Sequence, residues 1–171
     1  TVMEQLSDPE IYKVIWCHNL SYEFAFLQSL FDGKYTVDNM CARSIKAPIE
    51  FRVKELNLIF RCSYMLTNLS LAAAGKEYTT LEKRSGEDFN YNKARSPLTK
   101  LSDLEMEYCE YDIRVVTAII HHFLNEYEHI YNIPLTSTGI VRKKLRDTMD
   151  IYYIQKQQNL VPSSHMYMML W

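Results

Sequence analysis

The stretch IEFRVKELNLIFRCS, residues 49–63, contains two short runs in which apolar side chains recur with a period of two. Apolar residues occupy every second position from Ile49 to Val53 and again from Leu58 to Cys62. Side chains on a β-strand point to opposite faces in turn, so a period of two indicates strands. A turn near residues 55–57 joins the two runs. We therefore expect residues 35–64 to form a β-meander.

The segments on either side of this meander have their own periodicity. It predicts a buried strand over residues 11–17 and helices over residues 21–31, 68–74, 101–131 and 138–153. Ser102 and Glu105 form a capping box at the start of the longest helix, and Gly75 stands where the short helix is expected to stop. This order of elements predicts an α/β or α+β domain. Only one strand precedes the first helix, so the sheet is expected to be incomplete at its N-terminal side.

Composition restricts the class of protein. With 171 residues, of which 47% are hydrophobic, the chain is long enough for one domain with a core. Its net charge of −2 lacks the overall basic character of many nucleic-acid-binding proteins, and the basic cluster at residues 142–146 is typical of a solvated helix face. The four cysteines are scattered without zinc spacing, which indicates reduced thiols in a cytosolic protein. No apolar run reaches the roughly 18 residues of a membrane span.

Because the chain begins at Thr1 and stops in the apolar run 168–171, we expect a piece of a longer protein.

Asp112 is the first candidate for chemistry. It follows Tyr108 by four residues, so both side chains lie on one face of the long helix, next to apolar positions. A carboxylate in such a place is costly unless it is paired or binds a cation. The alternative is that Asp112 simply begins the polar edge of the helix.

Glu23 is the second candidate, four residues after Asn19. In one interpretation Asn19 or Ser21 caps the helix, and Glu23 favours the positive end of the helix dipole. In the other, both side chains lie beyond the carboxyl end of a strand, where open α/β sheets place their sites. Glu23 and Asp112 together would fit a magnesium site for phosphodiester cleavage, although such sites usually contain three or four carboxylates.

Several segments resemble motifs of family B DNA polymerases, in particular those of the protein-primed bacteriophage branch. The segment His18-Asn19-Leu20-Ser21-Tyr22-Glu23-Phe24 resembles the second exonuclease motif. The pair Tyr108-x3-Asp112 resembles the third, and Ser70–Ala74 resembles the motif that contacts single-stranded DNA. Residues 89–95 and 133–139 resemble two further segments in the family's order, so the resemblance covers nearly all of residues 10–171.

The chain also departs from the family pattern. The first exonuclease motif, Asp-x-Glu, is missing and is expected upstream of Thr1. Glu23 stands where the family has Asp, and Lys83 is the nearest counterpart of a family Lys that precedes Tyr91. The carboxylates of the polymerase palm are not present.

The resemblance implies a ribonuclease-H-like 3′–5′ exonuclease domain, N-terminally incomplete, over residues 1–131. Residues 132–171 would lead into a truncated polymerase domain. Glu23 and Asp112 would hold Mg²⁺ or Mn²⁺, and Tyr108 would position the attacking water. The residues implied to bind the DNA end are His18, Asn19, Ser70, Leu71 and Tyr91.

The full-length parent would be a viral DNA-directed DNA polymerase in the cytoplasm of an infected bacterium. Its partners would be the single-stranded 3′ end, primer-template DNA, dNTPs and, in the protein-primed branch, a terminal protein. The fragment alone is expected to be inactive. Two other readings remain open: a non-catalytic single-strand-binding module on the same scaffold, and a purely structural helical domain with Asp112 and Glu23 as solvated caps.

Overall fold

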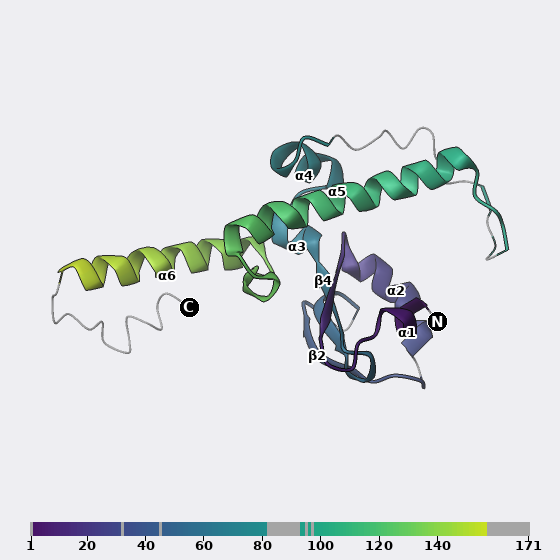
Figure 1. The fold of residues 1–171 in the computed structure, drawn as a ribbon, viewed down its shortest axis with the longest axis horizontal. Helices are drawn as coiled ribbons and strands as arrows, with labels where there is room; N and C mark the ends of the chain where they lie inside the picture. Colours follow the sequence, from purple (N-terminus) through teal and green to yellow (C-terminus); the bar gives the residue numbers. More distant parts are fainter. Residues whose placement is uncertain are drawn as a thin grey trace. The chain divides into compact units, whose positions relative to one another are not determined.

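A computed structural model describes residues 2–31, 33–44, 46–81, 93–94, 96 and 98–156 (Figure 1). The chain divides into two compact units, Thr1–Ser137 and Thr138–Trp171. The boundary predicted from the sequence was 131/132. Residues 132–137 belong with the first unit, where Ile133 is 2% exposed and therefore anchors this connection in the core.

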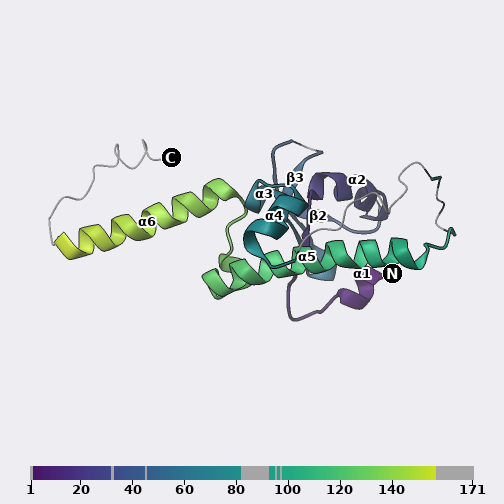
Figure 2. The same cartoon turned by 90° about the horizontal axis from the view of Figure 1, so that it is seen from above.

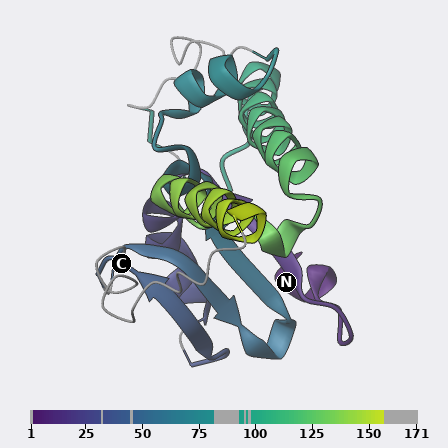
Figure 3. The same cartoon turned by 90° about the vertical axis from the view of Figure 1, so that its left-hand side faces the viewer.

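The first unit is built on a four-stranded mixed sheet with the order β1-β4-β3-β2 (Figure 3). Its strands are β1 (Lys13–Cys17), β2 (Val37–Ala42), β3 (Pro48–Val53) and β4 (Leu58–Cys62). Strands β2, β3 and β4 form an antiparallel meander, as residues 49–63 predicted, while β1 runs parallel to β4. The crossover from β1 to β2 contains a helix, so the α/β class is confirmed.

The helices of this unit flank the sheet and continue the chain after it. They are α1 (Val2–Leu6), α2 (Leu20–Phe31), α3 (Ser63–Thr67), α4 (Leu71–Tyr78) and α5 (Asp103–Tyr127), with 3₁₀ turns η1 (Lys54–Leu56) and η3 (Ile130–Asn132). Helix α6 (Ser137–Lys156) forms the described part of the second unit. None of the helices in the described ranges is long and apolar enough to cross a membrane.

An aromatic cluster holds α2 against the sheet. Phe24 and Phe31 lie on the buried face of α2, and each is at most 6% exposed. The rings of Phe51 and Phe60, from neighbouring strands, stack with centroids 4.7 Å apart, and Phe24 meets Phe51 edge-on at 5.0 Å. Each fully buried side chain of this kind contributes about 1.5–3 kcal/mol, so the cluster dominates the packing of α2.

The turn between β3 and β4 also fixes the entry to β1. Asn57 ends η1 in a left-handed conformation, with φ 52°. Its side-chain amide donates hydrogen bonds to the carbonyl oxygens of Asp8 (2.8 Å) and Pro9 (3.0 Å), and its own carbonyl accepts one from Lys13 N (2.9 Å). One residue therefore aligns the start of β1 with the start of β4.

The prediction of a short helix stopped by Gly75 is wrong. Asn68, with φ 56°, instead ends α3, a helix that the periodicity did not reveal. The next helix, α4, runs through Gly75 to Tyr78 and lies beside α5 (Figure 1 and Figure 2). A Cβ at Gly75 would come within 3.1 Å of both Leu81 O and Val115 Cγ1. The glycine is there because two helices approach closely, which only the tertiary structure reveals.

Helix α5 begins as predicted and ends earlier. Ser102 Oγ accepts a hydrogen bond from Glu105 N (3.3 Å), while the Glu105 carboxylate accepts one from Ser102 N (2.8 Å). The predicted capping box is therefore confirmed. Glu128, with φ 61°, ends the helix before residue 131, and η3 follows.

Substitution Gly75→Val should destabilise the first unit by about 1–3 kcal/mol, because the added side chain overlaps a backbone oxygen and the Val115 side chain. The free energy of unfolding from urea titration measures this loss. Ala73→Val, at an exposed position of the same helix, is the matched control and should lose only helix propensity. Equal stability of the two variants would contradict the close approach of α4 and α5.

Candidate functional site

A cleft of about 1010 Å³ opens in the first unit where β1 ends. Its walls come from the β1–α2 junction, from the start of α4 and from the middle of α5. Six of the residues singled out in the sequence line it: His18, Asn19, Glu23, Ser70, Leu71 and Asp112. Residues up to 94 positions apart in the chain are thus gathered in one hollow (112 − 18 = 94).

The parallel pairing of β1 with β4 builds the first wall. In the register Cys17 lies opposite Cys62, so the residues that follow both strands meet at the same edge. There His18 Nδ1 lies 3.1 Å from Ser63 Oγ, and its ring meets that of Tyr64 edge-on at 5.8 Å. These contacts hold the imidazole at the rim of the cleft.

Asn19 reverses the chain between strand and helix. Its φ of 64° is left-handed, a conformation that Asn tolerates better than most residues. The Asn19 carbonyl accepts hydrogen bonds from Tyr22 N (2.9 Å) and Glu23 N (3.5 Å), which starts α2. Ser21 lies inside α2, whose first residue is Leu20, so of the two predicted caps only Asn19 occupies the cap position. The turn places Glu23 in the first turn of α2, facing the cleft.

Ser70 and Leu71 form the second wall. Ser70 is the N-cap of α4, and its Oγ accepts a hydrogen bond from Ala73 N at 3.3 Å. Leu71, the first residue of the helix, is half-buried. The capping interaction therefore accounts for Ser70 locally, while its position at the cleft leaves it next to any bound molecule.

Helix α5 supplies the third wall with a stripe of residues four apart. Asp112, Val116 and Ile120 lie on one helix face and all line the cleft. Tyr108, one turn earlier, is 7% exposed and lies outside the set of lining residues, so the structure does not bring it into the cleft with Asp112. Tyr91 lies outside the described residues.

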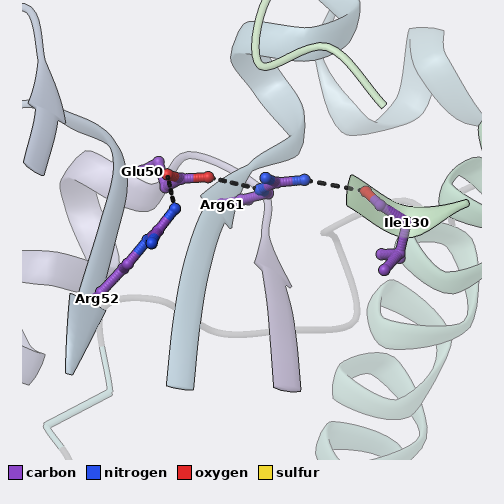
Figure 4. Close-up of polar contacts among 4 residues, drawn as sticks. All are labelled: Glu50, Arg52, Arg61 and Ile130. Atoms are coloured by element: carbon purple, nitrogen blue, oxygen red, sulfur yellow. Dashed lines mark hydrogen bonds and ion pairs between the residues drawn. The ribbon is translucent and has the colours of Figure 1, made fainter. Parts of the chain in front are cut away.

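A buried ion pair joins β3 and β4 and was not predicted from the sequence. Arg61 Nε donates to Glu50 Oε2 at 2.7 Å, and both residues are at most 7% exposed (Figure 4). Arg52 Nη2 lies 3.7 Å from the other oxygen of Glu50. The signal for this pair is the opposite charge at positions that face each other across the meander, Glu50 opposite Arg61.

The Arg61 guanidinium also contacts two residues that line the cleft. Its Nη1 donates to Ile130 O at 3.0 Å, which fixes the segment after α5 (Figure 4). The guanidinium also lies 5.8 Å from the ring centroid of Trp16, its neighbour on β1. Trp16 and Ile130 both line the cleft, so Arg61 contacts two lining residues without lining the cleft itself.

The described lining of the cleft carries carboxylates from Glu23 and Asp112 and contains neither Lys nor Arg. Burial raises the pKa of the Cys17 thiol to about 12, and the charge of Glu23 and the neighbouring Cys62 add to this shift. Carboxylate oxygens are ligands that Mg²⁺ prefers, so Glu23 and Asp112 are suitable donors. Among the residues that the structure describes, no group of three or more His, Cys, Asp or Glu side chains is placed to hold a metal ion.

Comparisons with protein-family models, with curated proteins and with solved structures found no match for this chain.

Substitution Arg61→Met should lower the free energy of unfolding by about 3–5 kcal/mol, because it leaves the buried Glu50 carboxylate without its main partner. The double substitution Glu50→Leu with Arg61→Met should recover most of that loss, because no buried charge remains. Urea unfolding of the three proteins measures both effects.

The matched control is Arg114→Met, whose partner Glu110 and whose own side chain are both more than 60% exposed. Exposed pairs contribute about 0–1 kcal/mol, so this variant should unfold almost like the wild type. Similar losses for Arg61→Met and Arg114→Met would contradict a special role for the buried pair.

Iodoacetamide at pH 8 should alkylate Cys41 at least about 100-fold faster than Cys17, because only the thiolate reacts and the raised pKa keeps Cys17 protonated. Cys41 is exposed, whereas Cys17 is half-buried. Mass spectrometry of the labelled peptides over time measures both rates. In urea the two thiols should react alike, and equal rates in the folded protein would contradict the environment described for Cys17.

Proposed function

We propose that this chain forms part of the proofreading region of a family B DNA polymerase, on a ribonuclease-H-like 3′–5′ exonuclease scaffold. One observation carries the proposal. Residues from three separate motif-like segments, around positions 18–24, 70–71 and 112, line a single cleft at the carboxyl edge of a parallel strand pair. Open α/β sheets bind ligands at this edge.

The cleft is suited to the end of a nucleic-acid strand. Its volume of about 1010 Å³ is at the upper end of the range of about 300–1,000 Å³ found for small-molecule sites, so it has room for more than one nucleotide. His18 and Asn19 offer polar groups for the sugar and phosphate of a 3′-terminal nucleotide, and Leu71 offers an apolar surface for its base. Ser70 and Tyr91 would assist in holding the strand.

Glu23 and Asp112 would act on the terminal phosphodiester. Their carboxylates would hold Mg²⁺ or Mn²⁺ at the scissile phosphate, and the cations would stabilise the attacking water and the leaving 3′ oxygen. Further carboxylates of such a site, including the Asp-x-Glu pair of the family, would come from residues outside this chain.

The remaining assignments belong to the same proposal. The parent polymerase would extend primer-template DNA from dNTPs in an infected bacterial cell, with a terminal protein as primer if it belongs to the protein-primed branch. The 171-residue chain alone would hydrolyse DNA poorly, because its carboxylate set is incomplete. A single-strand-binding module is the second candidate, and the test below separates the two.

The test is hydrolysis of a labelled single strand with Mg²⁺ by the polypeptide that contains this chain with its flanking sequence. Asp112→Ala should slow removal of 3′ nucleotides by at least about 100-fold, because the variant loses a carboxylate that neutralises charge in the transition state. Binding of the same strand in Ca²⁺ should stay within a few fold of the wild type.

Glu77→Gln, an exposed acid on α4 outside the cleft lining, is the matched control and should leave hydrolysis unchanged. Glu23→Asp, which restores the residue type of the family, should remain active. Undiminished digestion by Asp112→Ala would contradict the role of Asp112. Strand binding without digestion by the wild type would favour the binding module.

A further inference from the structure

A second hollow, of about 630 Å³, adjoins the cleft along α5. The two hollows share three residues, Ile113, Thr117 and His121, which recur every four positions along the helix. These residues form a ridge with one hollow on either side. Ile113 at the ridge is 66% exposed, an apolar side chain that a bound sugar or base would cover.

The two hollows differ in charge. The cleft carries the carboxylates of Glu23 and Asp112, which repel a phosphate that approaches without a cation. The lining of the second hollow, as far as the structure describes it, contains Arg114 and no carboxylate. A guanidinium binds phosphate oxygens through two parallel hydrogen bonds. The second hollow therefore offers the attraction for a strand backbone that the cleft lacks.

The Arg114 guanidinium can exchange its present carboxylate partner for a phosphate. Its Nη2 donates to Glu110 Oε1 at 2.6 Å, but the two side chains are 64% and 62% exposed. An exposed pair of this kind contributes little to stability, so a phosphate can replace the carboxylate at small cost.

The hollow also contains a surface on which bases can stack. The rings of Tyr78 and His122 lie 5.2 Å apart at an angle of 50°, and Tyr78 is supported from below by Phe123 at 5.0 Å. His122 is exposed, and the amide of Asn125, one helical turn further along, lines the same hollow. Aromatic rings bind the faces of bases without regard to sequence, and an amide can bond to their edges.

Resting on the proposed function, we infer that the second hollow holds the nucleotides that precede the terminal one on a bound single strand. Arg114 binds a backbone phosphate, His122 with Tyr78 stacks on a base, and the strand crosses the Ile113 ridge to put its 3′ end in the cleft. The substrate is accordingly a single strand several nucleotides long, which binds more tightly than a dinucleotide.

The experiment measures binding of fluorescent oligothymidylates of two and eight nucleotides to the 171-residue chain in Ca²⁺. The double substitution Arg114→Gln with His122→Ala should weaken binding of the octamer by about 10-fold or more and leave the dinucleotide within about twofold. Glu110→Gln should strengthen octamer binding, because it frees Arg114. Lys76→Gln, an exposed cation on α4 outside both hollows, is the matched control for loss of one positive charge.

Asn19→Gly separates this inference from the proposed function, because glycine keeps the left-handed turn and removes only the side chain. It should weaken binding of both lengths. Suppose Asn19→Gly weakens binding of both oligonucleotides, but the double substitution of Arg114 and His122 weakens binding of neither one, or of both equally. In that case the second hollow is not part of the strand path, and the proposed function still stands. If the wild-type chain binds neither oligonucleotide, the proposed function and this inference both fall.

Discussion

The buried contact between Glu50 and Arg61 organises the site. The two residues face each other on β3 and β4, on the face of the sheet opposite the aromatic cluster that holds α2. A buried charge is stable only with a partner of opposite charge. Here the Glu50 carboxylate is that partner, with its Oε2 2.7 Å from Arg61 Nε. The guanidinium Nη1 then donates to the carbonyl oxygen of Ile130, beyond the end of α5. In this way Arg61 connects the sheet to the segment that follows the long helix, and its two neighbours Trp16 and Ile130 line the cleft.

The location of the cleft follows from the parallel direction of strands β1 and β4. Because β1 and β4 run parallel, their carboxyl ends lie at one edge, and the residues after each strand turn into helices there. Asn19 makes the turn after β1, and Ser63 begins α3 directly after β4. Helix α5 returns across this edge with Asp112 on the face toward the opening.

Local signals predicted much of this arrangement, and their failures have physical causes. The period of two from residue 49 to residue 63 found the strands, and the capping box found the start of α5, because both depend on neighbouring residues. Gly75 was misread because its role is to let α4 approach Val115, a contact between distant segments. Tyr108 shares a face of α5 with Asp112, as its spacing indicated, yet it is only 7% exposed and does not line the cleft, because exposure depends on what packs against that face.

What the sequence alone determined is therefore the set of elements and the residue types that end them: apolar alternation, the Ser102 box, and the polar residues after the first strand. Only the tertiary structure decided which of these residues share a cleft. Parallel pairing of β1 with β4 joins segments about 45 positions apart, and α5 adds Asp112 from farther along the chain. Periodicity reports which face of an element is apolar, whereas the choice of partner for that face depends on packing and buried charge across the whole unit.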